Sequence, residues 1–336
     1  MYKSISCPII FKIGEDIINN IDDILQDAHL YFKGKILITQ KELFNLYADK
    51  LNKTEFSQII FVNGGDISEY EILSEKINTK ADVLVAFGGG SILDLVKYTS
   101  TKKNLPYLNI PSTLSNDSIY SPVARLTKDG KKVSFGVDSP LGLIVDFSII
   151  KKSPKKLLLA GVGDLLSNAS ALKDWKLSNI KGLEKINEFS FMISRSANNL
   201  LVNYSEIDIY SNIFLRDLTY GLVNSGLAML WCGSSRPASG SEHLISHAID
   251  EFYPEKSRVH GIQVAWAFLL IEKYCRKDIQ EYNKLKLFYN QIGLNALIKA
   301  EIPFSDKEFL ELIPLAIKIR NRYTILNEYV NLILLN

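Results

Sequence analysis

Histidine is rare in this chain, and most of its few copies lie close together. Of the 4 histidines in 336 residues, His243, His247 and His260 fall in one short stretch. His243 and His247 stand one helical turn apart, so on a helix both imidazoles project from the same face. Imidazoles combined with a carboxylate can bind a divalent ion and leave a coordination position open. Asp164 supplies a carboxylate inside a helical pattern, where an unliganded buried charge would be costly. A single histidine is more often a core or surface residue, but this clustering favours a metal site.

A glycine-rich turn follows one of the apolar segments near the N-terminus. Gly88-Gly89-Gly90-Ser91 comes directly after the run from Val83 to Phe87. Glycines permit positive φ and let a row of backbone N–H groups approach a pyrophosphate, while the next helix points its positive end at the anion. The same pattern also occurs in ordinary tight turns. Ligands in open α/β sheets bind at the carboxyl ends of strands, which favours a nucleotide site here.

A second polar segment begins where the next apolar run ends. It contains Ser112, Thr113, Ser115 and Asp117. The hydroxyls can line the nicotinamide side of a dinucleotide site, and Asp117 can meet a polar substrate. Taken alone, this composition is more typical of an ordinary capped loop.

The elements that would position these residues differ between the two halves of the chain. Short β-branched runs alternate with helical patterns, which predicts a doubly wound parallel sheet with a Rossmann-like fold. The predicted strands are 36–39, 58–62, 83–87 and 107–110, and the predicted helices between them are 41–51, 67–77 and 91–100. The runs 132–135 and 143–146 indicate a late hairpin or an added strand pair.

From Ser153 onward the apolar spacing becomes helical. Ser153 is a predicted N-cap and is followed by Pro154 and a run of leucines. Further helices are predicted at roughly 183–202, 207–230, 241–251, 258–275, 279–293 and 306–322. We therefore expect an α/β dinucleotide-binding domain over 1–152 and an all-helical metal- and substrate-binding domain over 153–336. The active site is expected in the cleft between them.

Composition narrows the classes of partner. The net charge is +2, and the basic residues are scattered among the acids, so nucleic acid is not an expected partner. Cys7, Cys232 and Cys275 show neither disulfide nor zinc-site spacing. No signal peptide and no membrane-length apolar run are recognised, so we expect a cytoplasmic enzyme without membrane insertion. A small-molecule substrate and a homo-oligomer are compatible with these features.

Five motifs in order resemble those of the iron-containing (metal-dependent) alcohol dehydrogenase and dehydroquinate synthase-like superfamily. The resemblance covers roughly residues 35–265. The stretches 160–165 and 233–243 make the chain most similar to the glycerol-1-phosphate dehydrogenases of that superfamily. The motifs are Gly88-Gly89-Gly90-Ser91 with Asp94, then Pro111, Thr113, Ser115 and Asp117, then Gly163-Asp164, then Glu242-His243 with Ser246-His247, and finally His260-Gly261.

The resemblance assigns a role to each site residue. It implies that Asp164, His243 and His260 bind one divalent ion, with zinc expected and iron or nickel as alternatives. His247 then lies near the substrate as a proton donor, and Asp117 faces the substrate alcohol. The implied dinucleotide contacts, for NAD or NADP, are Gly89, Gly90, Ser91, Asp94, Ser112, Thr113, Ser115, Ser121 and Val123.

The implied reaction is reversible hydride transfer between a nicotinamide and dihydroxyacetone phosphate, giving sn-glycerol 1-phosphate, with the metal polarising the carbonyl. A phosphorylated substrate needs fixed positive charge. We expect Arg236 to supply it, ahead of Arg258 and Lys132.

Several alternatives stay open at this point. Asn116 and Ser118 depart from the family's common residues, so another small polyol, alcohol or hydroxyalkyl phosphate can be the substrate. A dehydroquinate synthase-like lyase is disfavoured because that branch usually has glutamate where Asp164 stands. No carboxylate follows Leu37-Ile38-Thr39 to bind a ribose 2′-hydroxyl, so NADP is also expected to be accepted, with Lys41 near a 2′-phosphate.

Overall fold

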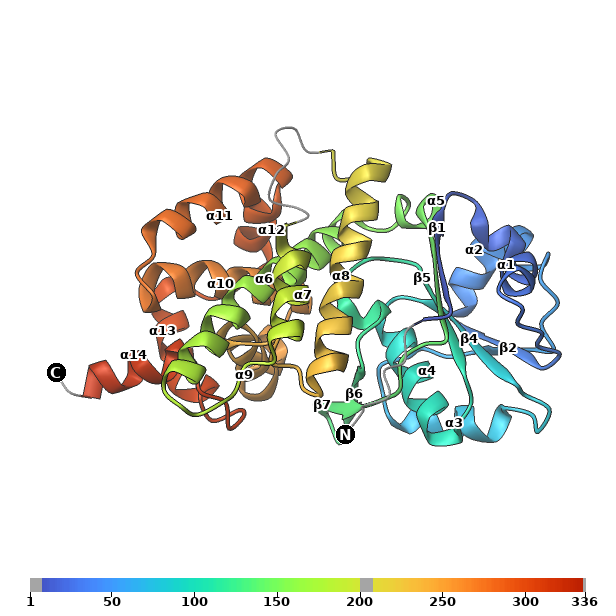
Figure 1. Ribbon diagram of the computed structural model, residues 1–336, viewed down its shortest axis with the longest axis horizontal. Coiled ribbons are helices and arrows are strands. Elements are labelled where there is room, and N and C mark those ends of the chain that lie inside the picture. Colours follow the sequence, from blue (N-terminus) through green and yellow to red (C-terminus); the bar gives the residue numbers. More distant parts are fainter. Residues whose placement is uncertain (1–7, 200–207, 335–336) are drawn as a thin grey trace. The chain divides into compact units, whose positions relative to one another are not determined.

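The chain divides into two compact units, an α/β unit and a helical unit (Figure 1). A computed structural model describes residues 8–199 and 208–334. The α/β unit contains residues up to Leu114 together with Ser118–Pro154. The helical unit contains the short segment Ser115–Asp117 together with the chain from Lys155 onward.

A six-stranded parallel sheet forms the centre of the α/β unit. Its spatial order is β1-β8-β5-β4-β2-β3, and all neighbouring strands run parallel. The strands are β1 (Ile10–Gly14), β2 (Lys35–Thr39), β3 (Gln58–Phe61), β4 (Val83–Gly88), β5 (Tyr107–Pro111) and β8 (Gly142–Asp146). Strands β2, β4, β5 and β8 are buried along their whole length, as a sheet covered on both faces requires. The predicted parallel sheet is confirmed.

Helices cover both faces of this sheet. The flanking elements are η1 (Ile17–Asn20), α1 (Ile21–Asp27), α2 (Lys41–Leu51), α3 (Ser68–Lys76), α4 (Gly90–Lys103) and the short α5 (Phe147–Ile150). Val83, Val85 and Phe87 of β4 join one buried cluster with residues of α1 and α2. The alternate residues Leu84 and Ala86 point to the opposite face, on which α3 and α4 lie (Figure 1).

The predicted runs 132–135 and 143–146 both form strands, but the two strands do not pair with each other. β7 (Lys131–Gly136) pairs antiparallel with β6 (Val123–Lys128), which the sequence did not reveal, whereas β8 enters the main sheet between β1 and β5. The burial patterns explain the separation. β8 is buried throughout and fits a covered sheet, whereas β7 alternates between exposed and half-buried residues and suits a small two-stranded ribbon.

The second unit is helical throughout its described residues, as predicted. Its helices are α6 (Lys155–Ile180), α7 (Glu188–Asn199), α8 (Asn212–Cys232), α9 (Ser241–Phe252), α10 (His260–Leu270), α11 (Ile279–Ile292), α12 (Leu294–Glu301), α13 (Asp306–Ala316) and α14 (Ile325–Leu334). Three short elements complete it: η2 (Asp117–Ile119) begins in its inserted segment, and η3 (Pro254–Lys256) and a π-helical turn (Ile271–Cys275) flank α10. Residues 200–202 of the predicted helix 183–202 and residue 207 of the predicted helix 207–230 lie outside the described residues, as does Cys7.

The long helix α6 organises this unit. It packs against α7, α8, α9 and α10, and its residues from Leu158 to Asn168 are all buried. The hydroxyl of Ser153, the predicted N-cap, donates to the carbonyl oxygen of Ile150 at 2.7 Å. In the described parts of the chain, no helix combines the length and apolar character needed to cross a membrane.

Candidate active site

Three helices of the helical unit bring together one carboxylate and two imidazoles. Asp164 comes from α6, His243 from α9, and His260 begins α10. The Nε2 atoms of His243 and His260 lie 3.6 and 3.7 Å from Oδ1 of Asp164. Ligand atoms around one tetrahedral zinc ion lie about 3.4 Å apart, given Zn–N bonds of about 2.1 Å. The donor set and its spacing therefore fit a single divalent ion.

Two glycines allow the helices that carry these ligands to approach closely. A Cβ atom on Gly163 would lie 2.5 Å from the carbonyl oxygen of Gly261, and one on Gly261 would overlap the carbonyl oxygen of Ala160. Any larger residue would push α6 and α10 apart. The tight crossing of these two helices sets Asp164 beside His260.

Each imidazole has a partner on its other ring nitrogen. Nδ1 of His243 lies 2.9 Å from Oε1 of Glu242, and Nδ1 of His260 lies 3.0 Å from Oγ of Ser246. The amide nitrogen of Gln263 donates to Oγ of Ser246 at 2.9 Å. Such partners select the tautomer that presents Nε2 to an ion and fix the orientation of the ring.

The imidazole of His243 and the two carboxylates beside it shift one another's pKa values. Burial alone would lower the pKa of His243, but its hydrogen bonds to Asp164 and Glu242 raise that pKa to about 9. Burial would raise the pKa values of the two carboxyls, but the neighbouring imidazole holds both below their usual values. The pocket therefore stabilises a cation between two carboxylates, as a metal site must.

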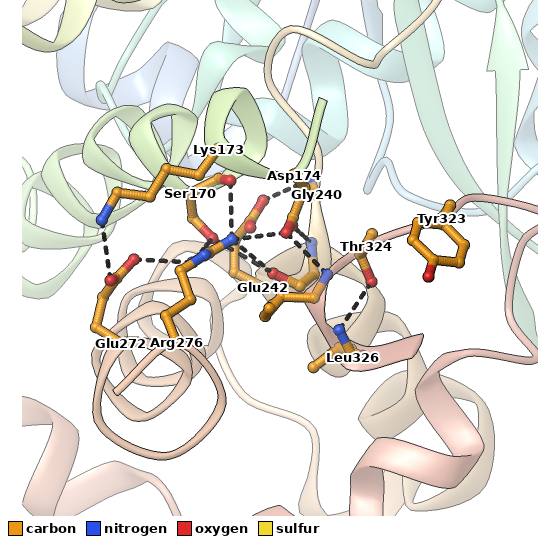
Figure 2. Close-up of polar contacts among 12 residues, drawn as sticks. Ser170, Lys173, Asp174, Gly240, Glu242, Glu272, Arg276, Tyr323, Thr324 and Leu326 are labelled. Atoms are coloured by element: carbon orange, nitrogen blue, oxygen red, sulfur yellow. Dashed lines mark hydrogen bonds and ion pairs between the residues drawn. The ribbon is translucent and has the colours of Figure 1, made fainter. Parts of the chain in front are cut away.

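A buried polar network holds the start of α9 in place. Asp174 accepts hydrogen bonds from the backbone N–H groups of Ser241 at 2.7 Å and Ile325 at 3.1 Å. Figure 2 shows the guanidinium of Arg276 between the carboxylates of Asp174 and Glu272, which lie 2.7 and 2.8 Å away. Burying these charges is tolerable because each has a close partner of opposite sign. The network fixes the backbone immediately before Glu242 and His243.

The two residues predicted to face the substrate also lie at this cluster. The backbone N–H of Asp117 donates to Oδ2 of Asp164 at 3.1 Å, and Oδ2 of Asp117 accepts from Oγ of Ser225 at 3.4 Å. The His247 ring stacks on His260 with 5.7 Å between ring centroids and an interplanar angle of 11°. His247 is thus adjacent to the ion-binding trio, and its Nε2 atom faces Nη2 of Arg320 at 3.5 Å.

The predicted pyrophosphate turn lies at the carboxyl edge of the sheet. Gly88 ends β4, Gly89 precedes the first residue of α4, and no side chain caps that helix. The backbone N–H of Ser112 donates to the carbonyl oxygen of Gly88 at 2.8 Å, so the two predicted segments lie side by side. Gly89 has φ −78°, so this turn does not use the positive φ that the sequence suggested.

The same edge contains a hydroxyl suited to a ligand. Oγ1 of Thr113 is buried and has no hydrogen-bond partner among the described residues. It lies beside Gly89, whose Cβ position would be 3.6 Å from the Thr113 methyl. An orphaned hydroxyl next to an uncapped helix N-terminus fits the phosphates or ribose of a dinucleotide.

Three other predicted cofactor residues converge on a lysine that the sequence analysis missed. Lys97 is fully buried, and its Nζ atom lies 3.1 Å from Oδ1 of Asp94, 3.3 Å from Oγ of Ser121 and 3.1 Å from the carbonyl oxygen of Val123. Burial raises the pKa of Asp94, and Lys97 opposes that shift. Lys97 thus ties β6 to α4 and fixes Asp94, Ser121 and Val123 in one cluster.

The basic residues predicted to bind phosphate groups differ in burial: Arg236 is buried, and the others are exposed. Arg236 is 3% exposed, and its Nη2 atom donates to the carbonyl oxygens of Asp174 and Tyr323 at 3.1 and 2.7 Å. Arg258 is exposed and bonds to backbone carbonyls, including that of Ser257 at 2.8 Å. Lys41 and Lys132 are exposed residues of the α/β unit.

Comparison with known proteins gives the family. Residues 12–154 match the sequence model described as iron-containing alcohol dehydrogenase. The chain is 33% identical to glycerol-1-phosphate dehydrogenase [NAD(P)+] of Archaeoglobus fulgidus over 97% of this chain and 94% of the relative. It belongs to the glycerol-1-phosphate dehydrogenases, within the iron-containing alcohol dehydrogenase family. The relative of the same name from Methanococcus aeolicus is 34% identical over 96% of this chain and 94% of its own.

Solved structures of a glycerol dehydrogenase and of an iron-containing alcohol dehydrogenase share the fold. Glycerol dehydrogenase from Schizosaccharomyces pombe aligns with a TM-score of 0.77 at 18% identity, covering 96% of this chain and 85% of that one. An iron-containing alcohol dehydrogenase from Thermotoga maritima aligns with a TM-score of 0.66 at 17% identity over 98% of both chains. The resemblance stated from the motifs is therefore confirmed.

Proposed function

We propose that this protein reduces dihydroxyacetone phosphate to sn-glycerol 1-phosphate with NADH or NADPH, and catalyses the reverse oxidation. The main support is the convergence of Asp164, His243 and His260 with ligand atoms within 4.8 Å of one another. The names of relatives that align over nearly the full chain support the substrate and the cofactor. Atoms balance when one hydride and one proton add across the carbonyl and NAD(P)+ is released.

The chain's own residues would bind and orient the substrate. A divalent ion held by the trio supplies Lewis acidity to the carbonyl oxygen when it is bound. Asp117 is held beside the trio by its backbone contact to Asp164, and its carboxylate would accept a hydrogen bond from a substrate hydroxyl there. The trio combines two imidazoles with one carboxylate, a donor set that would hold zinc, which we expect, and would also accept iron or nickel.

His247 would hold the proton that the product hydroxyl gains. Arginine can only donate hydrogen bonds, so the approach of Arg320 to Nε2 favours the tautomer with the proton on Nδ1. Imidazole ionises near neutral pH, which suits a group that gives up and regains a proton in each turnover.

The α/β unit would bind the nicotinamide cofactor, which supplies the hydride. Gly89, Gly90 and Ser91 would present backbone N–H groups to the pyrophosphate, and Thr113 would satisfy its orphaned hydroxyl on the ligand. Ser112 and Ser115 would complete the contacts along the same segment. Asp94, Ser121 and Val123 would shape the site through the Lys97 cluster.

The test is a panel of substrates, with turnover of each one measured by nicotinamide absorbance. Metal-stripped protein would be compared with protein reconstituted with zinc, iron or nickel, using dihydroxyacetone phosphate, dihydroxyacetone and glyceraldehyde 3-phosphate. We expect turnover with dihydroxyacetone phosphate that depends on added metal. The product should resist oxidation by a dehydrogenase specific for sn-glycerol 3-phosphate.

Two results would contradict this proposal. Efficient turnover of dihydroxyacetone or glycerol without turnover of the phosphorylated ketone would assign the site to an unphosphorylated polyol. Full activity in metal-stripped protein would remove the role of the trio.

A further inference from the structure

Three arginines gather beside the ion-binding trio in the helical unit. Arg236 lies in the loop between α8 and α9, and Arg320 and Arg322 lie in the segment between α13 and α14. The hydroxyl of Ser235 joins the last two: its Oγ atom accepts from Nη1 of Arg320 at 3.4 Å and from Nη2 of Arg322 at 3.0 Å. The two segments are distant in sequence, so the cluster exists only in the folded unit.

The cluster has an excess of positive charge. Glu184 pairs with Nη2 of Arg236 at 2.8 Å. Arg322, by contrast, has no carboxylate within ion-pair distance among the described residues, and it donates to the Ser239 carbonyl and the Ser235 hydroxyl. Burial, followed by the charges of Arg236 and Arg320, lowers the pKa of Arg322 to about 10. Nε and Nη1 of Arg236 are also buried without a hydrogen-bond partner among the described residues. Such an arrangement is costly without an anion to offset it.

The imidazole of His247 lies between the arginine cluster and the predicted metal ligand His260. Nη2 of Arg320 is 3.5 Å from Nε2 of His247, and His247 stacks on the ligand His260. In a hydroxyketone phosphate, one methylene and one ester oxygen separate the carbonyl carbon from phosphorus. A substrate whose carbonyl lies at the trio can therefore extend past His247 and reach these guanidinium groups with its phosphate.

We propose that Arg320 and Arg322, linked by the hydroxyl of Ser235, form the subsite that binds the substrate's phosphate monoester. Guanidinium groups bind phosphate oxygens in pairs with matched geometry, which lysine cannot reproduce. Arg236 supports this subsite from inside the protein, because its Nη2 atom holds the carbonyl oxygen of Tyr323, next to Arg322. This assignment rests on the proposed function and differs from the prediction that Arg236 itself contacts the phosphate.

The experiment compares Arg320→Gln and Arg322→Gln with the parent protein, and uses Arg195→Gln, at an exposed position of α7, as the matched control. KM and kcat are measured for dihydroxyacetone phosphate and for dihydroxyacetone. Each variant of the cluster should raise KM for the phosphorylated ketone about 10- to 100-fold, the effect expected for a lost hydrogen bond to a charged group. KM for dihydroxyacetone should stay unchanged in Arg322→Gln, whereas Arg320→Gln, which also loses the contact with His247, should raise KM far more for the phosphorylated ketone than for dihydroxyacetone. The control should change neither value.

A second measurement does not depend on turnover. Inorganic phosphate is titrated into the metal-loaded proteins by calorimetry, and zinc content and melting temperature report whether each variant is folded. We expect phosphate to bind the parent and Arg195→Gln and to bind Arg320→Gln at least about tenfold more weakly. If Arg322→Gln does not fold, Arg322→Lys, which keeps the charge but not the paired geometry, takes its place.

The outcomes separate the two proposals. If the parent does not reduce dihydroxyacetone phosphate, the proposed function fails, and phosphate binding alone decides the subsite. If the parent is active and the arginine variants keep the parent's KM and phosphate affinity, the subsite assignment is overturned.

Discussion

Replacement of Glu242 should weaken metal binding although Glu242 is not itself one of the predicted metal ligands. Glu242 is fully buried, and its Oε1 atom accepts from the backbone N–H of Gly240 at 2.6 Å and faces Nδ1 of His243 at 2.9 Å. Glu242→Gln keeps the shape and one acceptor oxygen but removes the charge. Glu242→Ala leaves both donors buried without a partner.

The expected magnitudes follow from these contacts. Loss of a carboxylate partner of a metal-binding histidine lowers metal affinity about 10- to 100-fold. We expect Glu242→Gln to lie near the lower limit because it retains an acceptor. Glu242→Ala should lie near the upper limit, since His243 then loses both its orientation and its preferred tautomer.

The assay is a zinc titration of metal-stripped protein in competition with a chromophoric chelator. Glu188→Gln, at an exposed position in the first turn of α7, is the control and should bind zinc like the parent. Circular dichroism checks that each variant is folded. Zinc affinities of both Glu242 variants within about twofold of the parent would refute the reasoning that Glu242 positions His243.

Three further perturbations test the architecture around this site. His260→Ala should remove stoichiometric zinc and activity together, measured by elemental analysis and nicotinamide absorbance. Gly261→Ala should destabilise the protein by about 1–3 kcal/mol and lower zinc affinity, because the added methyl overlaps the carbonyl of Ala160; urea unfolding and zinc titration measure the two effects. Arg276→Met should lower the free energy of unfolding by about 3–5 kcal/mol, because it leaves the buried charge of Asp174 without its partner.

Each of these expectations can fail in a distinct way. Retention of zinc by His260→Ala would place another residue in the ligand set. Unchanged stability and zinc affinity in Gly261→Ala would show that the crossing of α6 and α10 can accommodate an added methyl group. A stability loss below about 1 kcal/mol for Arg276→Met would mean that water solvates the network.

The elements were predictable wherever the apolar pattern had one simple explanation. Buried runs such as Val83–Phe87 and the helix Lys41–Leu51 agree with the structure because periodicity and turn residues point the same way. β1 was missed because it is short and largely exposed or half-buried, so it lacks a continuous apolar signal. The turn after β7 resembles a hairpin locally, and only the different burial of β7 and β8 separates them.

The residues that would bind the metal were predictable from the sequence, but most of the residues that hold them in position were not. Asp164, His243 and His260 follow from residue type and motif order, and the structure brings their ligand atoms together. Glu242 stands beside His243 in the quoted motif, and a carboxylate next to a predicted metal-binding histidine was a usable signal. No local pattern connects Arg320 with the loop at Ser235, because that contact depends on how distant helices pack.

The segment Ser115–Asp117 makes the helical unit discontinuous in sequence. A fragment that begins at Lys155 would contain Asp164, His243 and His260 but would lack the backbone N–H that Asp117 donates to Asp164. During synthesis, this segment leaves the ribosome before the helices it joins, so its contacts with them can form only after those helices have been made. The metal centre can therefore form only after the start of α10 has been made, and a chimaera between relatives would need to exchange Ser115–Asp117 together with the helices from Lys155 onward.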